Sequence, residues 1–311
     1  MTDLVIIAGP TAVGKSAVSV ELAKRINGSI ISADSMQVYR GMDIGTAKLT
    51  HEEMGGIPHF LIDVLDPSED FNIVMFKEMA TSAIKDINKS GRIPMIVGGT
   101  GFYIQSVLYD IDFPEGDEMT QYRMELAQLI ETKGPQYVHD MLKAVDCVAA
   151  AKIHPNDHKR VIRALEYNKQ TGGLISEHNR AAAEHKSPYN FCYFVLVDDR
   201  EKIYERINER VDKMIENGLV DEVRDLLGQG LTKENVSMHG LGYKEIIDHL
   251  EGRCSLSEAV YAIKRDSRHF AKRQLTWFKR EKDVFFINIR EREAMLDIMT
   301  DELRKRGIID G

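Results

Sequence analysis

The sequence predicts an α/β protein with a parallel sheet core flanked by helices and interrupted by an inserted, mainly helical domain. Three observations lead to this fold class. The strand-like segments are short continuous apolar runs, which are typical of parallel strands buried on both faces. A glycine-rich loop and an apolar-periodic helix directly follow the first run. Strand-like runs return after a long helical stretch, which indicates an insertion into the core rather than a separate C-terminal domain.

The elements of the core are expected at both ends of the chain. Its first part alternates strand, helix, strand, helix and strand, at Leu4–Ala8, Ala17–Ile26, Ser29–Ala33, Ile73–Asn88 and Ile93–Val97. Helical periodicity without strand signals follows, for example at Tyr122–Ile130 and Tyr137–Val145. The last part adds two strands and two long helices, at Phe191–Val197, Val284–Ile289, Arg200–Leu227 and Ser257–Arg280. These positions assign residues 1–113 and 190–311 to the core and 114–189 to the insert.

Composition narrows the class of protein. The 311 residues are 43% hydrophobic and 29% charged, which excludes a disordered chain. No apolar run approaches the ~20 residues that a membrane helix needs, and Asp3 stands where a secretory signal is basic. The three cysteines are far apart and predict neither a disulfide framework nor a zinc pair. We therefore expect a cytoplasmic, monomeric protein without membrane contact.

The net charge of −8 describes only the average electrostatic potential of the protein. Basic and acidic residues are segregated along the chain, so local regions can be strongly basic. Between Lys264 and Lys282 there are eight basic and two acidic residues, and between Lys152 and Arg180 there are six and three. On a helix over 260–279, one face would carry the basic residues Arg265, Arg268, Lys272 and Lys279, and the opposite face would carry Ile263, Phe270 and Trp277. Such a face is either solvated surface or a contact for a polyanion.

The segment Gly9–Ser16 (GPTAVGKS) fits the phosphate-loop pattern G-x-x-x-x-G-K-[ST] between a predicted strand and a predicted helix. Its backbone N–H groups and the helix N-terminus can surround a phosphate. Lys15 would neutralise terminal phosphate oxygens, and the Ser16 hydroxyl would bind Mg²⁺. The alternative is a glycine-containing turn with a chance lysine. The motif makes the core P-loop NTPase-like, and it predicts phosphate contacts from Gly9, Pro10, Thr11, Ala12, Val13, Gly14, Lys15 and Ser16.

The carboxylate that an NTPase uses for its metal is missing from the expected strand. NTPases carry an Asp at the end of such a strand, but Ile93–Val97 is followed by Gly98-Gly99-Thr100-Gly101. The candidate carboxylate is Asp34, which directly follows Ser29–Ala33. Because strand C-termini line the ligand crevice of open α/β sheets, Asp34 and Thr100 could share a site with the phosphate loop. The alternative role for Asp34 is to cap a turn or helix.

Seven stretches of the chain are distinctive when taken together. They are GPTAVGKS (Gly9–Ser16), ISADSMQVYRGMDIGTAK (Ile31–Lys48), PHFLID (Pro58–Asp63), GRIPMIVGGTGFYI (Gly91–Ile104), IHPNDHKRVIRALE (Ile153–Glu166), GLGYKE (Gly240–Glu245) and AKRQLTWF (Ala271–Phe278). In this order the set resembles the bacterial tRNA dimethylallyltransferase family, also called tRNA isopentenyltransferase, over nearly the whole chain. Only the first stretch is expected in unrelated P-loop proteins.

The resemblance implies transfer of a dimethylallyl group from its diphosphate to N6 of the adenine at tRNA position 37, next to the anticodon. The adenine must leave the base stack to react, so the insert would clamp the anticodon stem-loop. The implied partners are therefore tRNA and dimethylallyl diphosphate, with Mg²⁺ as cofactor. The phosphate loop would hold the leaving diphosphate instead of presenting a γ-phosphate.

The resemblance also implies roles for single residues. Asp34 would be the general base on N6, Thr100 would bind the diphosphate near its bridging oxygen, and Lys15 would hold the rest. Arg210 would add a second cation, with Arg206 as the alternative. The residues implied in tRNA contact are Asp34, Ser35, Met36, Gln37, Thr100, Arg123, Lys159, Arg160, Val161, Ile162, Arg163, His239, Gly240, Leu241, Gly242, Tyr243 and Lys244.

Other functions and roles compete with this interpretation. A P-loop small-molecule kinase would use Asp34 to activate a hydroxyl, and a free-adenine-nucleotide isopentenyltransferase would need no tRNA clamp. The insert and the basic helix count against both. A regulatory P-loop ATPase that binds RNA would need a carboxylate after Ile93–Val97. Four side chains could line a channel for the prenyl group or belong to the core: Met36, Tyr39, Phe102 and Tyr103.

Overall fold

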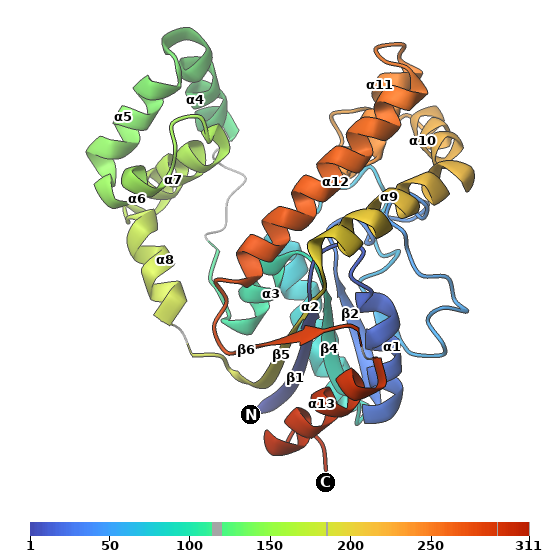
Figure 1. Ribbon diagram of the computed structural model, residues 1–311. Coiled ribbons are helices and arrows are strands. Elements are labelled where there is room, and N and C mark those ends of the chain that lie inside the picture. Colours follow the sequence, from blue (N-terminus) through green and yellow to red (C-terminus); the bar gives the residue numbers. More distant parts are fainter. Residues whose placement is uncertain (114–119, 185, 291, 311) are drawn as a thin grey trace. The chain divides into compact units, whose positions relative to one another are not determined.

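The computed structural model describes residues 1–113, 120–184, 186–290 and 292–310 (Figure 1). The chain divides into two compact units, the core unit (Met1–Leu108 with Pro188–Gly311) and the insert (Tyr109–Ser187). The α/β fold class with a helical insertion is confirmed. Within the described residues, no helix combines the length and the apolar character that crossing a membrane requires.

A six-stranded sheet forms the centre of the core unit, in the order β3-β2-β4-β1-β5-β6 with every pairing parallel. Its strands are β1 (Thr2–Ala8), β2 (Gly28–Ala33), β3 (His59–Phe60), β4 (Ile93–Gly98), β5 (Tyr189–Val197) and β6 (Val284–Asn288). The run from β2 through β4, β1 and β5 to β6 can be followed in Figure 1. Five of the six were predicted to within two residues at each end. The sequence pattern missed β3, because a two-residue strand has no periodicity.

Different helices cover the two faces of the sheet. Val5 and Ile7 of β1 belong to a buried apolar cluster that includes residues of α1 (Lys15–Ile26) and α13 (Arg292–Lys305). The opposite face is covered by α2 (Ile73–Lys89) and α3 (Gly101–Leu108), which contact β4 and each other. Both faces are therefore buried, which is why the strands are continuous apolar runs.

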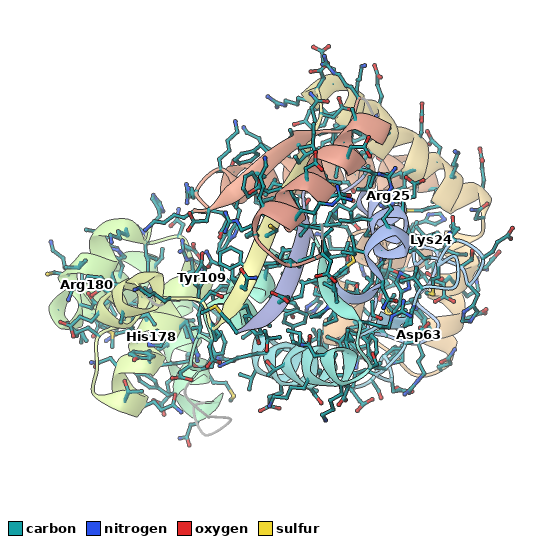
Figure 2. The ribbon with its side chains drawn as sticks, turned by 90° about the horizontal axis from the view of Figure 1, so that it is seen from below. Lys24, Arg25, Asp63, Tyr109, His178 and Arg180 are labelled. Carbon is teal, nitrogen blue, oxygen red and sulfur yellow. The ribbon has the colours of Figure 1, made fainter. Side chains whose placement is uncertain are left out.

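The helix α1 begins at the phosphate loop and has a charged C-terminal end. Lys24 and Arg25, labelled in Figure 2, are exposed in its last turn, where cations stabilise the terminal carbonyls. Arg25 also forms a 2.6 Å ion pair with Asp297 of α13. This exposed pair links the C-terminal end of α1 to α13, at the opposite end of the helix from the loop.

The C-terminal half of the core unit contains α9 (Arg200–Glu216), α10 (Leu219–Gly228), the short 3-10 helix η1 (Val236–His239), α11 (Tyr243–Leu250) and α12 (Leu256–Phe278). The single long helix predicted over Arg200–Leu227 is wrong. Gly218 separates α9 from α10 with φ of 99°, in the left-handed region that an α-helix cannot contain. The long helix predicted over Ser257–Arg280 is confirmed as α12.

The insert contains α4 (Thr120–Lys133), α5 (Pro135–Val145), α6 (Cys147–Lys152), α7 (His158–Thr171) and α8 (Ile175–Glu184). Leu126, Val138, Leu142 and Leu165 are part of a separate apolar cluster at its centre. The basic residue Arg180 is exposed on α8 (Figure 2). Because it has its own core, the insert meets the usual criterion for a structural domain.

Candidate active site

The C-terminal ends of three adjacent strands define the candidate active site. Gly98 at the end of β4 pairs in register with Ala8 of β1 and with Ala33 of β2. The residues that follow these ends are Gly9, Asp34 and the pair Gly99–Thr100. Sheet register alone therefore brings the phosphate loop, the candidate carboxylate and Thr100 to one edge of the sheet.

The phosphate loop depends on close backbone approach at its first residue. Gly9 has φ of 151°, and a Cβ there would lie 2.7 Å from the carbonyl oxygen of Leu196. Lys15 Nζ turns back into the loop and donates to the carbonyl oxygens of Gly9 at 3.0 Å and Pro10 at 2.8 Å. The ammonium group is thus held by two neutral acceptors, which a phosphate oxygen can replace.

Three charged side chains act on one another beside this loop. Burial lowers the pKa of Lys15 to about 8, with Asp34 opposing the shift and Arg210 adding to it. Burial also lowers the pKa of the Arg210 guanidinium, again with Asp34 opposing. Two cations and one carboxylate therefore share a partly desolvated environment in which each charge is felt by the others.

Asp34 has two roles in the structure. Its Oδ1 accepts a hydrogen bond from the backbone N–H of Met36 at 2.9 Å, so the carboxylate does stabilise the turn after β2. The same side chain also lines a cavity of about 50 Å³. The other walls of the cavity include Lys15, Ser16, Ser32, Gln37, His59 and Val97.

The two candidate arginines on α9 are held differently. Arg210 Nη2 donates to the carbonyl oxygen of Thr46 at 3.2 Å. Arg206 instead donates from Nε to the carbonyl oxygen of Ala12 and from Nη2 to Asp198, at 2.9 and 2.8 Å. Arg210 is the arginine whose charge acts on Lys15 and Asp34.

Of the stretch Asp34–Gln37, the two end residues line the cavity, and Gln37 Oε1 accepts from Ser32 Oγ at 3.0 Å. The stretch around α11 is divided between surface and core. His239 and Lys244 are exposed, whereas Tyr243 is fully buried and donates from its hydroxyl to Glu222 at 2.7 Å. The Tyr243 side chain therefore packs in the core and offers no surface to RNA.

The implied tRNA contacts in the insert are divided in the same way. Lys159, Arg160 and Arg163 are exposed on α7, while Val161 is 1% exposed and packs in the core of the insert with Ile162 beside it. Arg123 forms a two-point ion pair with Glu166, at 2.8 and 3.0 Å. Because Glu166 is 1% exposed, this pair fixes α4 to α7.

The basic face of α12 is only partly available to a partner. Lys272 and Lys279 are exposed, but Arg268 donates to Asn208 at 2.6 Å and Arg265 pairs with Asp266. On the opposite face Ile263 is buried, whereas Phe270 and Trp277 are only partly buried. Of the four possible channel residues, only Tyr39 is fully buried in the core. Tyr103 is partly buried and stacks on Phe76 at 4.4 Å, Met36 is partly buried and Phe102 is exposed.

Sequence reasoning missed three side chains that hold the site together. Gln274 of α12 bonds to the phosphate loop and to Gly99. Asp198 after β5 is bound by Arg206, and Glu222 of α10 accepts from the backbone N–H groups of Asp43, Ile44 and Gly45. Gln274 lies inside the distinctive stretch AKRQLTWF, which was the one signal that could have identified it.

The parallel sheet, the phosphate loop and the charges at its edge define a P-loop α/β enzyme. A model of the IPP transferase family matches residues 37–281, and a model of the Isopentenyl transferase family matches residues 2–70. The chain belongs to the tRNA dimethylallyltransferase, or IPP transferase, family, as the distinctive stretches predicted. Membership decides against the kinase and the regulatory ATPase.

Relatives match over nearly the full length. The tRNA dimethylallyltransferase of Lachnoclostridium phytofermentans is 58% identical over 304 residues, covering 98% of this chain and 97% of that protein. The one from Carboxydothermus hydrogenoformans is 53% identical over 281 residues, or 90% of each. The crystal structure of the Bacillus halodurans tRNA isopentenylpyrophosphate transferase is 44% identical, with a TM-score of 0.75 over 99% of this chain and 98% of that one. A eukaryotic dimethylallyltransferase acting on tRNA reaches a TM-score of 0.83 at 28% identity, covering 99% and 80%.

Proposed function

We propose that the protein transfers a dimethylallyl group from dimethylallyl diphosphate to N6 of the adenine at tRNA position 37, next to the anticodon. The products are N6-(dimethylallyl)adenosine and diphosphate. The observation that carries the proposal is that Lys15 and Asp34 line the cavity at the phosphate loop, with the Arg210 guanidinium near enough for its charge to act on both. Two cations suit a leaving diphosphate, and the carboxylate suits an amine that must lose a proton.

The chemistry explains why the leaving group needs most of the catalytic help. The N6 lone pair is delocalised into the adenine ring, so the amine is a weak nucleophile. As the allylic C–O bond breaks, its electron pair moves onto the diphosphate and positive charge spreads over the prenyl carbons. Lys15, Arg210 and the loop N–H groups stabilise the developing negative charge in a partly desolvated site, an effect worth several kcal/mol. Thr100 is assigned to the oxygen that bridges carbon and phosphorus.

Asp34 is assigned as the general base. The amine gains a positive charge as the new C–N bond forms, and one N6 proton passes to the carboxylate. Oδ1 is held by the Met36 N–H, which fixes the orientation of the whole group. A base with a fixed orientation can hold the amine in line with the allylic carbon.

Mg²⁺ fits the donors at this edge of the sheet. The Ser16 hydroxyl lines the cavity with the Asp34 carboxylate, and both are hard oxygen ligands of the kind Mg²⁺ prefers. Among the described residues there is no group of three or more His, Cys, Asp or Glu that could enclose a metal by itself. Mg²⁺ is commonly held by one or two protein oxygens together with substrate phosphates. Ser16 is the residue we assign to it, and bound Mg²⁺ would offset diphosphate charge.

A single-turnover assay tests the reaction. Anticodon stem-loop RNA, radiolabelled dimethylallyl diphosphate and Mg²⁺ are combined with the protein, and free AMP replaces the RNA in a parallel reaction. We expect label on the stem-loop and none on AMP. Label on AMP would identify a free-nucleotide prenyltransferase, and no label on either acceptor would contradict the proposal.

A further inference from the structure

Gln274 connects the two segments that are proposed to hold the diphosphate. Its Oε1 accepts from the backbone N–H of Thr11 at 2.8 Å, and its Nε2 donates to the carbonyl oxygen of Gly99 at 3.0 Å. The residue is 6% exposed and lies on the buried side of α12, next to the fully buried Ala271 and Phe278. One amide thus bridges the middle of the phosphate loop and the turn that carries Thr100.

A carboxamide side chain matches both ends of this bridge. The two partners have opposite polarity, since the loop presents an N–H and the turn presents a carbonyl oxygen. A glutamate could accept from Thr11 but could not donate to Gly99, and a lysine could donate but not accept. Of the two carboxamides, glutamine has the longer reach from α12, because asparagine is one methylene shorter.

The turn that carries Thr100 is also pressed against α12 on both sides of that residue. A Cβ on Gly99 would lie 2.1 Å from Gln274 Nε2, and a Cβ on Gly101 would lie 2.2 Å from Nε1 of Trp277. Gln274 and Trp277 are three residues apart and hence on the same face of the helix. The helix therefore sets the position of Thr100 through two glycine contacts, of which only the one at Gln274 extends to the phosphate loop.

We infer that Gln274 is a positioning residue that fixes the distance between the phosphate loop and Thr100, so that both can contact one diphosphate. The inference rests on the proposed function, because that function assigns both segments to the diphosphate. Gln274 itself touches backbone, and it acts through Thr100 and the loop.

A double-mutant cycle tests the inference. We expect Gln274→Met to lower kcat/KM for dimethylallyl diphosphate 10- to 50-fold, while tRNA affinity changes less than twofold. If Gln274 acts through Thr100, Gln274→Met in a Thr100→Ala background should lower kcat/KM for dimethylallyl diphosphate less than threefold. The Thr100 hydroxyl that Gln274 would position is already absent from that background. Effects that multiply in the double variant would overturn the inference.

Two further variants separate positioning from a general loss of stability. Gln105→Met is the matched control, because it makes the same substitution at a glutamine that does not bond to the phosphate loop. Gln105 Nε2 instead donates to Glu281 Oε1 at 2.8 Å. Activity of Gln274→Met equal to that of this control would contradict the inference. Gln274→Glu keeps the length of the side chain and can still accept from the Thr11 N–H. In a double-mutant cycle with Thr100→Ala, its added negative charge is present both with and without the Thr100 hydroxyl, so the effect of the charge cancels. It is the variant to use where Gln274→Met does not fold, and it should show the same non-additivity.

Binding of inorganic diphosphate and orthophosphate, measured by calorimetry without RNA, gives a readout independent of turnover. We expect Gln274→Met to weaken diphosphate binding about tenfold and orthophosphate binding less than twofold, since orthophosphate is too small to touch both segments. Equal weakening of both ligands would count against the inference. Wild-type protein that binds diphosphate but labels no RNA would instead contradict the proposed function.

Discussion

Arg206 donates a hydrogen bond from Nε to the carbonyl oxygen of Ala12 at 2.9 Å, so this arginine supports the phosphate loop from outside. Ala12 has φ of 60°, a conformation that costs energy for a residue with a Cβ. The other end of Arg206 binds Asp198, whose side chain is 3% exposed. Arg210, one turn further along α9, has its charge coupled to Lys15 and Asp34. Neighbouring arginines on one helix thus have different roles.

Replacing each arginine by alanine should separate these roles. Arg210→Ala is expected to lower kcat/KM for dimethylallyl diphosphate about 10²- to 10³-fold, as the loss of one donor to a developing anion does, with little change in Tm. Arg206→Ala leaves the buried Asp198 with one fewer partner, so it should cost about 2 kcal/mol of unfolding free energy. Kinetics and thermal unfolding measured on both variants check the assignment, and a reversed pattern would exchange the two roles.

Asp34→Asn tests the general base without disturbing the turn. The amide oxygen can still accept from the Met36 N–H, but the side chain can no longer take a proton. We expect single-turnover transfer to fall about 10²- to 10⁴-fold, with affinity for the stem-loop RNA within a factor of three. Asp34→Ala should lose transfer to a similar extent and should also loosen the turn. Near wild-type transfer by Asp34→Asn would contradict the assignment.

The lowered pKa of Lys15, to about 8 because of burial, predicts a pH dependence. The ammonium group is charged below this pH and loses its proton as the pH rises through it. Since only the cation attracts diphosphate, kcat/KM for dimethylallyl diphosphate should fall about tenfold per pH unit above the pKa. Lys15→Arg should remove this decline between pH 8 and 10, whatever its absolute activity, because a guanidinium stays charged. A flat wild-type profile over that range would contradict the prediction.

Lys159 and Arg163 are exposed one turn apart on α7 and are expected to contact the RNA backbone. Alanine at either position should weaken stem-loop binding and reduce the salt slope of log K by about one. Single-turnover rates at saturating RNA should stay within a factor of two. Fluorescence anisotropy at several salt concentrations measures both quantities. An unchanged salt slope would show that these side chains are ordinary solvated surface.

Arg123 is expected to stabilise the insert through its two-point pair with the buried Glu166. Arg123→Ala leaves that carboxylate without its partner, at a cost of about 2 kcal/mol, since the Arg123 side chain is itself 60% exposed. Replacing both residues by methionine should recover most of the loss, because no unpaired charge remains. Chemical denaturation of the two variants tests this. If Arg123→Ala had unchanged stability and bound RNA more weakly, Arg123 would be a tRNA-contacting residue instead of a stabilising one.

Much of the fold could be predicted because its signals are local. The apolar run before Gly9 and the helix after Ser16 place the phosphate loop on a strand–loop–helix unit, and β4 and β5 are apolar runs of the same kind. The break between α9 and α10 was missed, because the apolar periodicity continues across Asn217–Gly218 and hides a single residue with positive φ. A continuous apolar periodicity shows which side chains are buried, but it does not show whether they belong to one helix or to two successive helices.

Site residues could be predicted from sequence where a motif or the end of a predicted strand fixes their location. Asp34 directly follows β2, and Lys15 begins α1 at the end of the loop that follows β1, so strand order brings them together. Arg206 and Arg210 could not be distinguished by sequence, because both lie on one face of α9 and only their partners differ. Tyr243 was implied in tRNA contact, but its ring is buried against Gly45, so its place in the stretch GLGYKE is explained by core packing.

The sequence by itself determined the parallel α/β core, the helical insertion, the phosphate loop and the family, since these depend on short-range patterns and on motifs in fixed order. Only the tertiary structure decided which side chains complete the site. Gln274 meets Thr11 across 263 positions of the chain, and Arg210 meets Thr46 across 164. Contacts of this kind leave no periodicity in the sequence. They exist because the folded sheet fixes the separation of helices that the chain itself keeps far apart.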